Sequence, residues 1–281
     1  MKRISSITTH LTNSTPSAGQ EKENPVTVTI EGVNGEIGVI SMSYASNMNA
    51  LNHEMRTSLV QAFNTLESNP VVKVICLRSV LPKVFCAGAN IKDIVQLTHE
   101  KRINHDLFKD VCNVVNSCRK PIIAAINKLA LGGGLEIALL CDVIICSEDA
   151  TIGLPEIKLG VMPGIGGTLI SKIIGKSNAM KMILTGESIN AKTALELGVV
   201  SEVHKPEELH KKQLKLAEKM AKYSLYSLAL AKNATKFSFE NPSSMALEHE
   251  RRLFDSLMNL PGAKEGLPAF VEKRTPNFKS K

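Results

Sequence analysis

Three consecutive glycines at positions 132–134 constrain the fold of this chain more than any other feature. They follow an apolar run at 122–126 and precede another at 135–140, which is the order of a strand, a tight turn and a helix. The first amides of a helix have no partner inside the helix and lie at the positive end of its dipole. Glycines let that backbone approach a bound atom closely. The turn predicts either a site for developing negative charge or only a close helix–strand contact, and Glu136 follows in the first helical turn.

Strands and helices alternate over the first two thirds of the chain, which predicts an α/β fold with a largely parallel sheet. Strands are expected at 26–31, 37–42, 71–77, 121–126 and 142–146, and helices at 52–67, 98–117, 135–140 and after 168. From residue 190 onward the pattern is almost all helical, in segments at 191–197, 206–222, 225–239, 245–260 and 263–272. We therefore expect a core at 25–200 and a helical region at 201–281, covered either by the core or by a neighbouring subunit.

The first 24 residues have a different composition from the rest. The first twenty contain Lys2 and Arg3, many serines and threonines, and no acidic residue. That composition is typical of a mitochondrial transit peptide, although a disordered tail has the same character. We expect a mitochondrial protein, with the cytoplasm as the alternative location.

Composition excludes several classes of protein. A hydrophobic fraction of 43% indicates a large core, and no apolar run approaches the ~20 residues of a membrane helix. The six cysteines form no CxxC pair, so we expect buried free thiols and no metal site. The net charge of +7 suits either an anionic ligand or a solvated basic surface.

Two glutamates are candidates for chemistry. Glu136 follows the triple-glycine turn, and Glu156 follows Gly153-Leu154-Pro155, so each lies beside a turn that could reach one pocket. Paired carboxylates are what general acid–base catalysis on a water molecule requires. Most glutamates are solvated surface residues, so the prediction depends on these two turns.

The ordered motifs resemble the crotonase, or enoyl-CoA hydratase/isomerase, superfamily over about residues 26–281. The residues that carry the resemblance are 85–92, 130–136 with 141–142, 153–156 through 163–168, 184–186 with 194–200, and 269–274. The resemblance implies a crotonase fold of repeated ββα units in a spiral, with a C-terminal helical region used in trimer packing. It also implies a homotrimer or homohexamer.

The resemblance further implies reversible hydration of a 2-enoyl-CoA thioester, in fatty-acid or branched-chain amino-acid catabolism. The family holds the thioester oxygen with two backbone amides, which match Ala89 and Gly133 here. Its two water-holding glutamates match Glu136 and Glu156. No cofactor is implied beyond the CoA of the substrate.

The family's CoA-contacting residues also have counterparts in this chain. They match Ala87, Asn90, Ile91 and Lys92 in the first motif and Phe270 and Lys273 near the C-terminus. Two positions depart from the family pattern. Residues 46–48 lack the usual basic residue, and Lys128 stands where glycine is common. Lys128 is either strained, if the position needs a positive φ, or directed toward an anionic acyl group.

Within the family, the motifs look most like the methylglutaconyl-CoA hydratase group and its relatives. Two rival functions stay open. One is Δ3,Δ2-enoyl-CoA isomerisation with a single proton-shuttling glutamate. The other is RNA binding, as in some members of that group, but the corresponding helix at 52–67 carries only Arg56 as a basic residue and offers no stacking aromatics beside it. Nucleic acid is therefore not expected as a partner.

Overall fold

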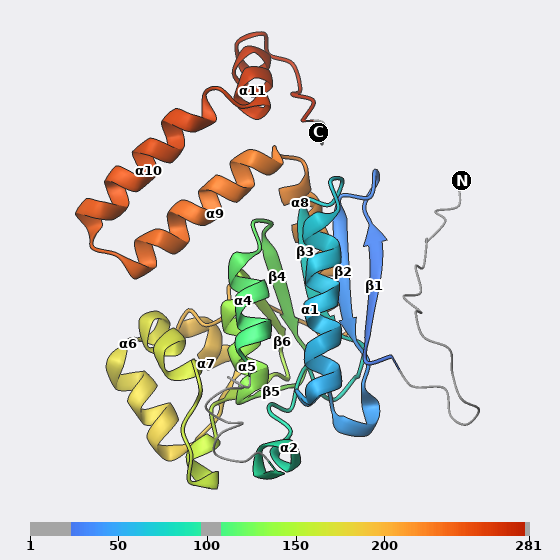
Figure 1. Cartoon of the computed structure of the whole chain (residues 1–281), viewed down its shortest axis with the longest axis vertical. Coiled ribbons are helices and arrows are strands. Elements are labelled where there is room, and N and C mark those ends of the chain that lie inside the picture. Colours follow the sequence, from blue (N-terminus) through green and yellow to red (C-terminus); the bar gives the residue numbers. More distant parts are fainter. Residues whose placement is uncertain (1–23, 97–107, 279–281) are drawn as a thin grey trace.

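The computed structural model describes residues 24–96 and 108–278, and its centre is a six-stranded sheet (Figure 1). The strand order is β1-β2-β3-β4-β6-β9, with β1 and β2 antiparallel and every other neighbouring pair parallel. The strands are β1 (Val26–Glu31), β2 (Ile37–Met42), β3 (Val74–Ser79), β4 (Ile122–Ile126), β6 (Val143–Ser147) and β9 (Glu202–His204). The mostly parallel sheet confirms the predicted fold class. A turn at Asn34-Gly35, a pair typical of hairpins, joins β1 to β2.

Helices cover both faces of this sheet. The helices α1 (His53–Ser68), α4 (Lys109–Ser117) and α5 (Gly133–Leu140) lie on one face, and α8 (Leu209–Ala221) contacts β2, β3, β4 and β6 on the other. Alternate residues of a strand point to opposite faces. In β3, Ile75 and Leu77 join the main core under α1, whereas Val74 and Cys76 join the smaller core under α8.

The helix α1 forms where its apolar spacing predicts. The Asn52 side chain accepts a 2.8 Å hydrogen bond from Met55 N and so caps the helix. Five apolar residues at helical spacing are buried and form its inner face, namely Met55, Leu59, Ala62, Phe63 and Leu66. Of the helix expected at 98–117, only α4 lies within the described residues.

A second, three-stranded sheet is absent from the sequence-based prediction. Its strands are β5 (Leu129–Leu131), β7 (Thr151–Gly153) and β8 (Ile189–Asn190). These strands have two or three residues each, too few to show a period in the sequence. Each of β5 and β7 follows a strand of the main sheet and precedes a helix, α5 or α6 (Gly166–Thr185), which makes the repeated ββα unit of the crotonase fold.

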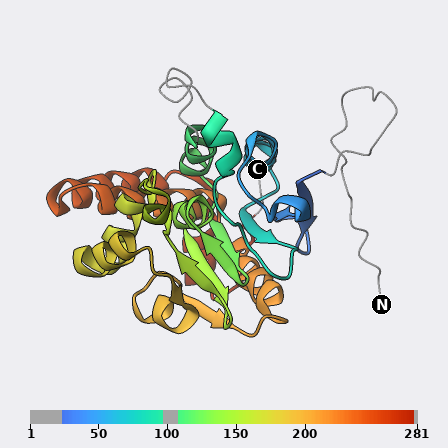
Figure 2. The same ribbon diagram turned by 90° about the horizontal axis from the view of Figure 1, so that it is seen from below.

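The C-terminal third begins on the core and then leaves it. After α7 (Ala191–Glu196), β9 joins the main sheet, and α8 packs on it. The helix α9 (Leu225–Glu240) then runs away from β1, α10 (Ser243–Leu257) turns back alongside α9, and α11 (Pro261–Val271) follows at the top of Figure 1. Figure 2 shows this helical region from below, at the side away from β1. The strand β9 was not expected in a region that looked helical throughout. The boundary near residue 200 stays a prediction.

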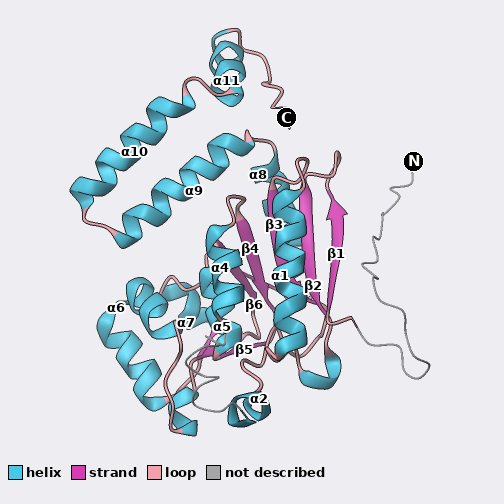
Figure 3. Ribbon diagram, in the orientation of Figure 1, coloured by secondary structure: helices cyan, strands magenta, loops and turns pink. Residues whose placement is uncertain are grey.

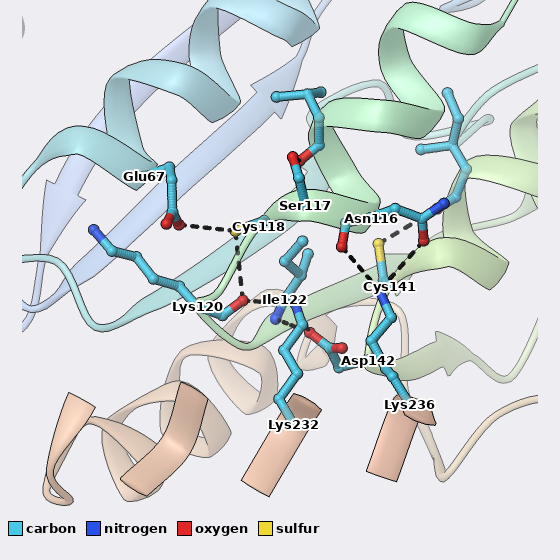
Figure 4. Close-up of polar contacts among 12 residues, drawn as sticks. Glu67, Asn116, Ser117, Cys118, Lys120, Ile122, Cys141, Asp142, Lys232 and Lys236 are labelled. Atoms are coloured by element: carbon cyan, nitrogen blue, oxygen red, sulfur yellow. Dashed lines mark hydrogen bonds and ion pairs between the residues drawn. The ribbon is translucent and has the colours of Figure 1, made fainter. Parts of the chain in front are cut away.

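Polar contacts attach α9 to the core (Figure 4). No residue of α9, which the structure describes throughout, is buried. Lys232 Nζ lies 2.7 Å from Asp142 Oδ2 and donates to Lys120 O at 2.9 Å. Lys236 Nζ donates to the carbonyl of Asn116, near the C-terminal end of α4, where a cation complements the helix dipole. The close-up shows these two lysines rising from α9 toward the ends of the core helices.

The cysteines behave as small apolar residues. None of the six, all of which lie in the described residues, forms a disulfide, and all except the partly exposed Cys112 are buried. Burial raises the pKa of the Cys76 and Cys86 thiols to about 12, so they stay protonated near neutral pH. Among the described helices, none is long and apolar enough to cross a membrane.

Candidate active site

The short second sheet brings the two predicted catalytic segments together. Leu131 pairs with Gly153 in the parallel β5–β7 ladder, and Gly132 N donates a 2.9 Å hydrogen bond to Gly153 O. In Figure 3 this small sheet lies below the main one, at the start of α5. The segment before Glu136 is therefore directly bonded to the segment before Glu156.

The two predicted oxyanion donors lie side by side. Gly88 has a φ of +105°, and a Cβ atom there would lie 2.7 Å from Leu131 O and 3.5 Å from Gly133 N. A Cβ atom on Gly133 would lie 3.5 Å from Ala89 N. Within the described part of the chain, neither the Ala89 amide nor the Gly133 amide donates a hydrogen bond to another group. The arrangement leaves two adjacent N–H groups for an oxygen atom.

Glu136 is held by the start of the helix that follows the second glycine-rich turn. The residue is 3% exposed, and its Oε1 atom accepts hydrogen bonds from Ile165 N at 2.9 Å and Gly166 N at 2.7 Å. A Cβ atom on Gly166 would lie 3.1 Å from the same oxygen, so only glycine fits comfortably there. The Oε2 atom faces Gly164, where a Cβ atom would be 3.8 Å away.

Glu156 approaches the site from the other side. It begins the 3₁₀ helix η2 (Glu156–Leu159), and its Oε1 atom would lie 3.0 Å from a Cβ atom on Gly132. Its Oε2 atom is buried and has no hydrogen-bond partner among the described residues. Burial raises the pKa of the Glu156 carboxyl, and the charge of Glu136 raises it further. This carboxyl therefore holds a proton at higher pH than an exposed glutamate does.

The residues matched to CoA contacts fall into two groups. Ala87, Asn90, Ile91 and Lys92 lie directly beside the oxyanion donors, where the Asn90 side chain accepts a bond from Lys92 N and caps α2 (Ile91–Gln96). Ile91 and Lys92 are exposed. Phe270 and Lys273 lie at the C-terminal end of α11, at the opposite end of the chain's structure in Figure 1. One chain does not bring the two groups together.

The structure decides between the two interpretations of Lys128. Its φ is +58°, the left-handed conformation that favours glycine, so the strained alternative is correct. Its Nζ atom bonds to Asp149 Oδ2 at 3.1 Å, and its amide donates to Ser147 Oγ. The side chain is therefore directed to Asp149 rather than to an acyl group.

Some residues that shape the site were missed from the sequence. Asn49 is fully buried and has a φ of +55°. Its Nδ2 atom donates hydrogen bonds to Ser79 Oγ and Phe85 O, and its Oδ1 atom accepts one from Tyr44 N. These bonds fix the loop that leads to Leu51, which in turn donates to Gly88 O at 2.8 Å. The sequence signal was an asparagine before Ala50-Leu51, a residue type that tolerates positive φ.

The RNA alternative has little in the structure to support it. Arg56, the basic residue of α1, has its guanidinium 3.5 Å from Asp110 and only 13% of its side chain exposed.

In residues 24–96 and 108–278, no group of three or more His, Cys, Asp or Glu side chains is placed to hold a metal ion. The sequence also leads us to expect that the loop around residues 95–106 governs pocket size, and most of this loop lies outside the described residues.

Comparisons with known proteins show which family the chain resembles. Residues 32–281 match the family model described as enoyl-CoA hydratase/isomerase. The chain is 40% identical over 248 residues to the probable mitochondrial enoyl-CoA hydratase of Dictyostelium discoideum, covering 88% of this chain and 89% of that protein. It is 38% identical over 244 residues to the 2,3-dehydroadipyl-CoA hydratase of Escherichia coli K12, covering 86% and 95%. The crystal structure of enoyl-CoA hydratase from Bacillus anthracis is similar with a TM-score of 0.85 and 31% identity, covering 92% and 100%.

Proposed function

Because the chain belongs to the enoyl-CoA hydratase/isomerase family, we propose that it is an enoyl-CoA hydratase, which adds water reversibly across the 2,3 double bond of a 2-enoyl-CoA thioester. Relatives at 37–41% identity that carry this name span most of the chain and support the assignment. The observation that carries the proposal is the position of two carboxylates near two adjacent backbone amides. Glu156 lies against Gly132, next to the Gly133 amide, and Glu136 is bonded to the amide of Gly166 in the second glycine-rich turn.

In the first step, the thioester oxygen binds between the amides of Ala89 and Gly133. Two preorganised N–H donors stabilise the negative charge that develops on this oxygen when water attacks C3, because the intermediate is an enolate. Gly133 is also the first residue of α5, so the helix dipole adds to the effect. Removing one such donor typically costs about a hundredfold or more in rate.

The two glutamates have different roles in proton transfer, one as the acceptor and one as the donor. Two amides fix one oxygen of Glu136, which leaves its Oε2 atom to accept a proton from the attacking water. Glu156, whose pKa is raised, is suited to deliver a proton to C2 as the enolate collapses. Its buried, unpartnered Oε2 atom would bond the same water before the reaction.

The CoA portion of the substrate would lie along residues 87–92, with Lys92 near its phosphates. Phe270 and Lys273 would contact CoA bound to another copy of the chain, because α11 lies far from α2 in its own copy. Phe270 is 84% exposed, and other exposed apolar side chains on α9, α10 and α11 support the same arrangement. They are Tyr226, Phe239, Met245, Leu247, Phe254, Leu267 and Val271. We propose a trimer or a pair of trimers, and no cofactor beyond the CoA of the substrate.

We also propose that residues 1–24 direct the protein to mitochondria. The basic, hydroxyl-rich composition supports this, as do relatives from Dictyostelium discoideum and Pongo abelii whose names include that location. Bacterial relatives match equally well, so the proposed location depends on the composition of residues 1–24. A fluorescent fusion with and without these residues tests it.

Hydration of crotonyl-CoA, followed as loss of the conjugated thioester absorbance, tests the proposed function. The wild type should turn over, and Glu136→Gln and Glu156→Gln should each lose on the order of a hundredfold or more. Product analysis with a 3-enoyl-CoA distinguishes an isomerase from a hydratase. Activity on methylglutaconyl-CoA tests the resemblance to the methylglutaconyl-CoA hydratase group. No turnover on any 2-enoyl-CoA would contradict the proposal.

A further inference from the structure

A buried asparagine lies behind the segment that supplies one oxyanion donor. Asn49 is fully buried, and its side-chain nitrogen donates to Phe85 O at 2.9 Å and to Ser79 Oγ at 2.8 Å. Its side-chain oxygen accepts a hydrogen bond from Tyr44 N at 2.8 Å. The amide therefore uses its N–H donors on groups of the protein interior, where it acts on the chain around it.

Ser79 extends the same network to the start of the donor segment. It is also fully buried, and its Oγ atom donates to Val84 O at 2.7 Å and accepts from Leu81 N at 3.0 Å. Because the single hydroxyl proton goes to Val84 O, the hydroxyl can only accept from Asn49. Two consecutive carbonyls, those of Val84 and Phe85, are thus fixed by Ser79 and Asn49.

The backbone beside Asn49 contacts the rest of the donor segment. Cys86 Sγ donates to Asn49 O at 3.0 Å. Leu51 N donates to Gly88 O at 2.8 Å, and Leu51 forms a parallel bridge with Ala89. The segment that ends at the Ala89 amide is therefore bonded along one side to the loop that contains Asn49.

The backbone of Asn49 restricts which residues can stand there. Its φ of +55° lies in the left-handed region, which glycine, asparagine and aspartate adopt more readily than other residues. Glycine fits this backbone but has no side chain. Aspartate has the same shape, but its carboxylate has no N–H group to donate to Phe85 O. Among these three residues, only asparagine satisfies both the backbone and the hydrogen bonds.

We propose that Asn49 is a positioning residue for the oxyanion hole, and that its side chain sets the place of the Ala89 amide. This inference rests on the proposed hydratase function and deepens it by naming the residue through which one donor is preorganised. The donors act most strongly on the charge of the transition state, so the effect falls on kcat more than on KM. A displacement of about 1 Å in such a group can cost on the order of a hundredfold in rate.

The test compares Asn49→Gly and Asn49→Asp with the wild type in hydration of crotonyl-CoA. Both variants tolerate the backbone, and both lose the hydrogen bond to Phe85 O. In each, kcat should fall by about tenfold or more, while KM changes by less than about threefold. The absorbance of bound cinnamoyl-CoA, a conjugated thioester, should shift less to longer wavelength than in the wild type, because a displaced amide polarises its carbonyl less.

Gln213→Met is the matched control. Gln213 is also fully buried, and its side-chain nitrogen donates to two backbone carbonyls, Leu77 O at 3.0 Å and Ile123 O at 2.7 Å. It lies on α8, on the other face of the main sheet. This variant should lose stability, because a buried amide is removed, and should keep both the kcat and the absorbance shift of the wild type.

Ser79→Ala is a second variant of the same network and decides the matter if the Asn49 variants do not fold. Its kcat and absorbance shift should fall in the same direction. Wild-type values in folded Asn49→Gly or in Ser79→Ala would overturn the inference, as would an equal loss of kcat in Gln213→Met. If the wild type hydrates crotonyl-CoA and the Glu136 and Glu156 variants lose activity, that failure would leave the proposed function standing.

Discussion

The amide of Gly132 donates a hydrogen bond of 2.9 Å to the carbonyl of Gly153. This bond extends the β5–β7 ladder and joins the turn before Glu136 to the strand before Glu156. The proposed chemistry needs these two segments side by side, because each carries one of the glutamates.

Gly132→Ala should disrupt this arrangement. Gly132 has φ +51° and ψ −127°, and a Cβ atom would lie 3.0 Å from Glu156 Oε1. The backbone strain should cost about 1–3 kcal/mol of unfolding free energy, and displacement of Glu156 should lower kcat at least tenfold. Denaturant unfolding and crotonyl-CoA kinetics measure the two effects.

Gly160→Ala is the control for backbone strain alone. Gly160 also has a positive φ, +74°, but its Cβ position has no neighbour within 4 Å among the described atoms. It should lose stability and keep its kcat. Equal kcat in Gly132→Ala and wild type would show that the turn does not position Glu156.

The raised pKa of Glu156 gives a prediction about pH and stability. The folded state binds this proton more tightly than the unfolded chain, so the wild type loses stability as pH rises from 4.5, the ordinary pKa of glutamate, through the raised pKa of the folded state. Glu156→Gln has no such titration. The variant should therefore gain stability relative to wild type as pH rises from about 4 to 7. Parallel melting curves for the two proteins across that range test it; a constant difference would contradict the raised pKa.

The same carboxyl should govern the pH dependence of hydration. If Glu156 delivers the proton to C2, kcat/KM falls as pH rises through its folded-state pKa, because the proton donor is lost. A pH–rate profile with crotonyl-CoA measures this. A profile that stays flat above neutral pH would assign the proton to another group.

Lys128→Gly should be more stable than Lys128→Ala. Both variants lose the exposed ion pair with Asp149, but only glycine relieves the left-handed backbone at φ +58°. The difference should be about 1 kcal/mol in unfolding free energy. Both variants should keep wild-type kcat, since the side chain is directed to Asp149. A large loss of kcat in both would indicate a role at the acyl group after all.

Lys232→Met should loosen α9. The ion pair with Asp142 is largely buried, with 7% and 17% of the two side chains exposed, and losing one partner leaves an uncompensated charge. Hydrogen exchange in α9 should rise. Lys192→Met removes an exposed pair with Glu196 and should change nothing measurable. Unchanged exchange in Lys232→Met would show that other contacts hold α9.

The sequence was sufficient to predict an element where the element is long enough to show a hydrophobic period or begins with a capping residue. The α1 face from Met55 to Leu66 and the Asn52 cap follow from spacing alone. The strands β5, β7, β8 and β9 have two or three residues, so their positions depend on pairing partners far along the chain. The predicted oxyanion donors are adjacent in the structure, but their roles in catalysis stay a prediction.

The missed parts of the site share one physical reason. The amides of Ile165 and Gly166 bind Glu136 through backbone atoms, which carry no signature in the residue type. The Asn49 side chain meets Phe85 O across 36 positions of the chain. Such contacts arise from tertiary structure, and no local window of sequence contains them.

The bridges Leu51↔Ala89 and Cys86↔Ala130 join three distant segments of the chain around the oxyanion donors. No locally folded fragment can contain this site, since each loop must close before the two amides meet. During refolding, catalytic competence should thus return with the slowest phase rather than with helix formation. Enzyme activity would serve as a kinetic probe for the last long-range contacts to form.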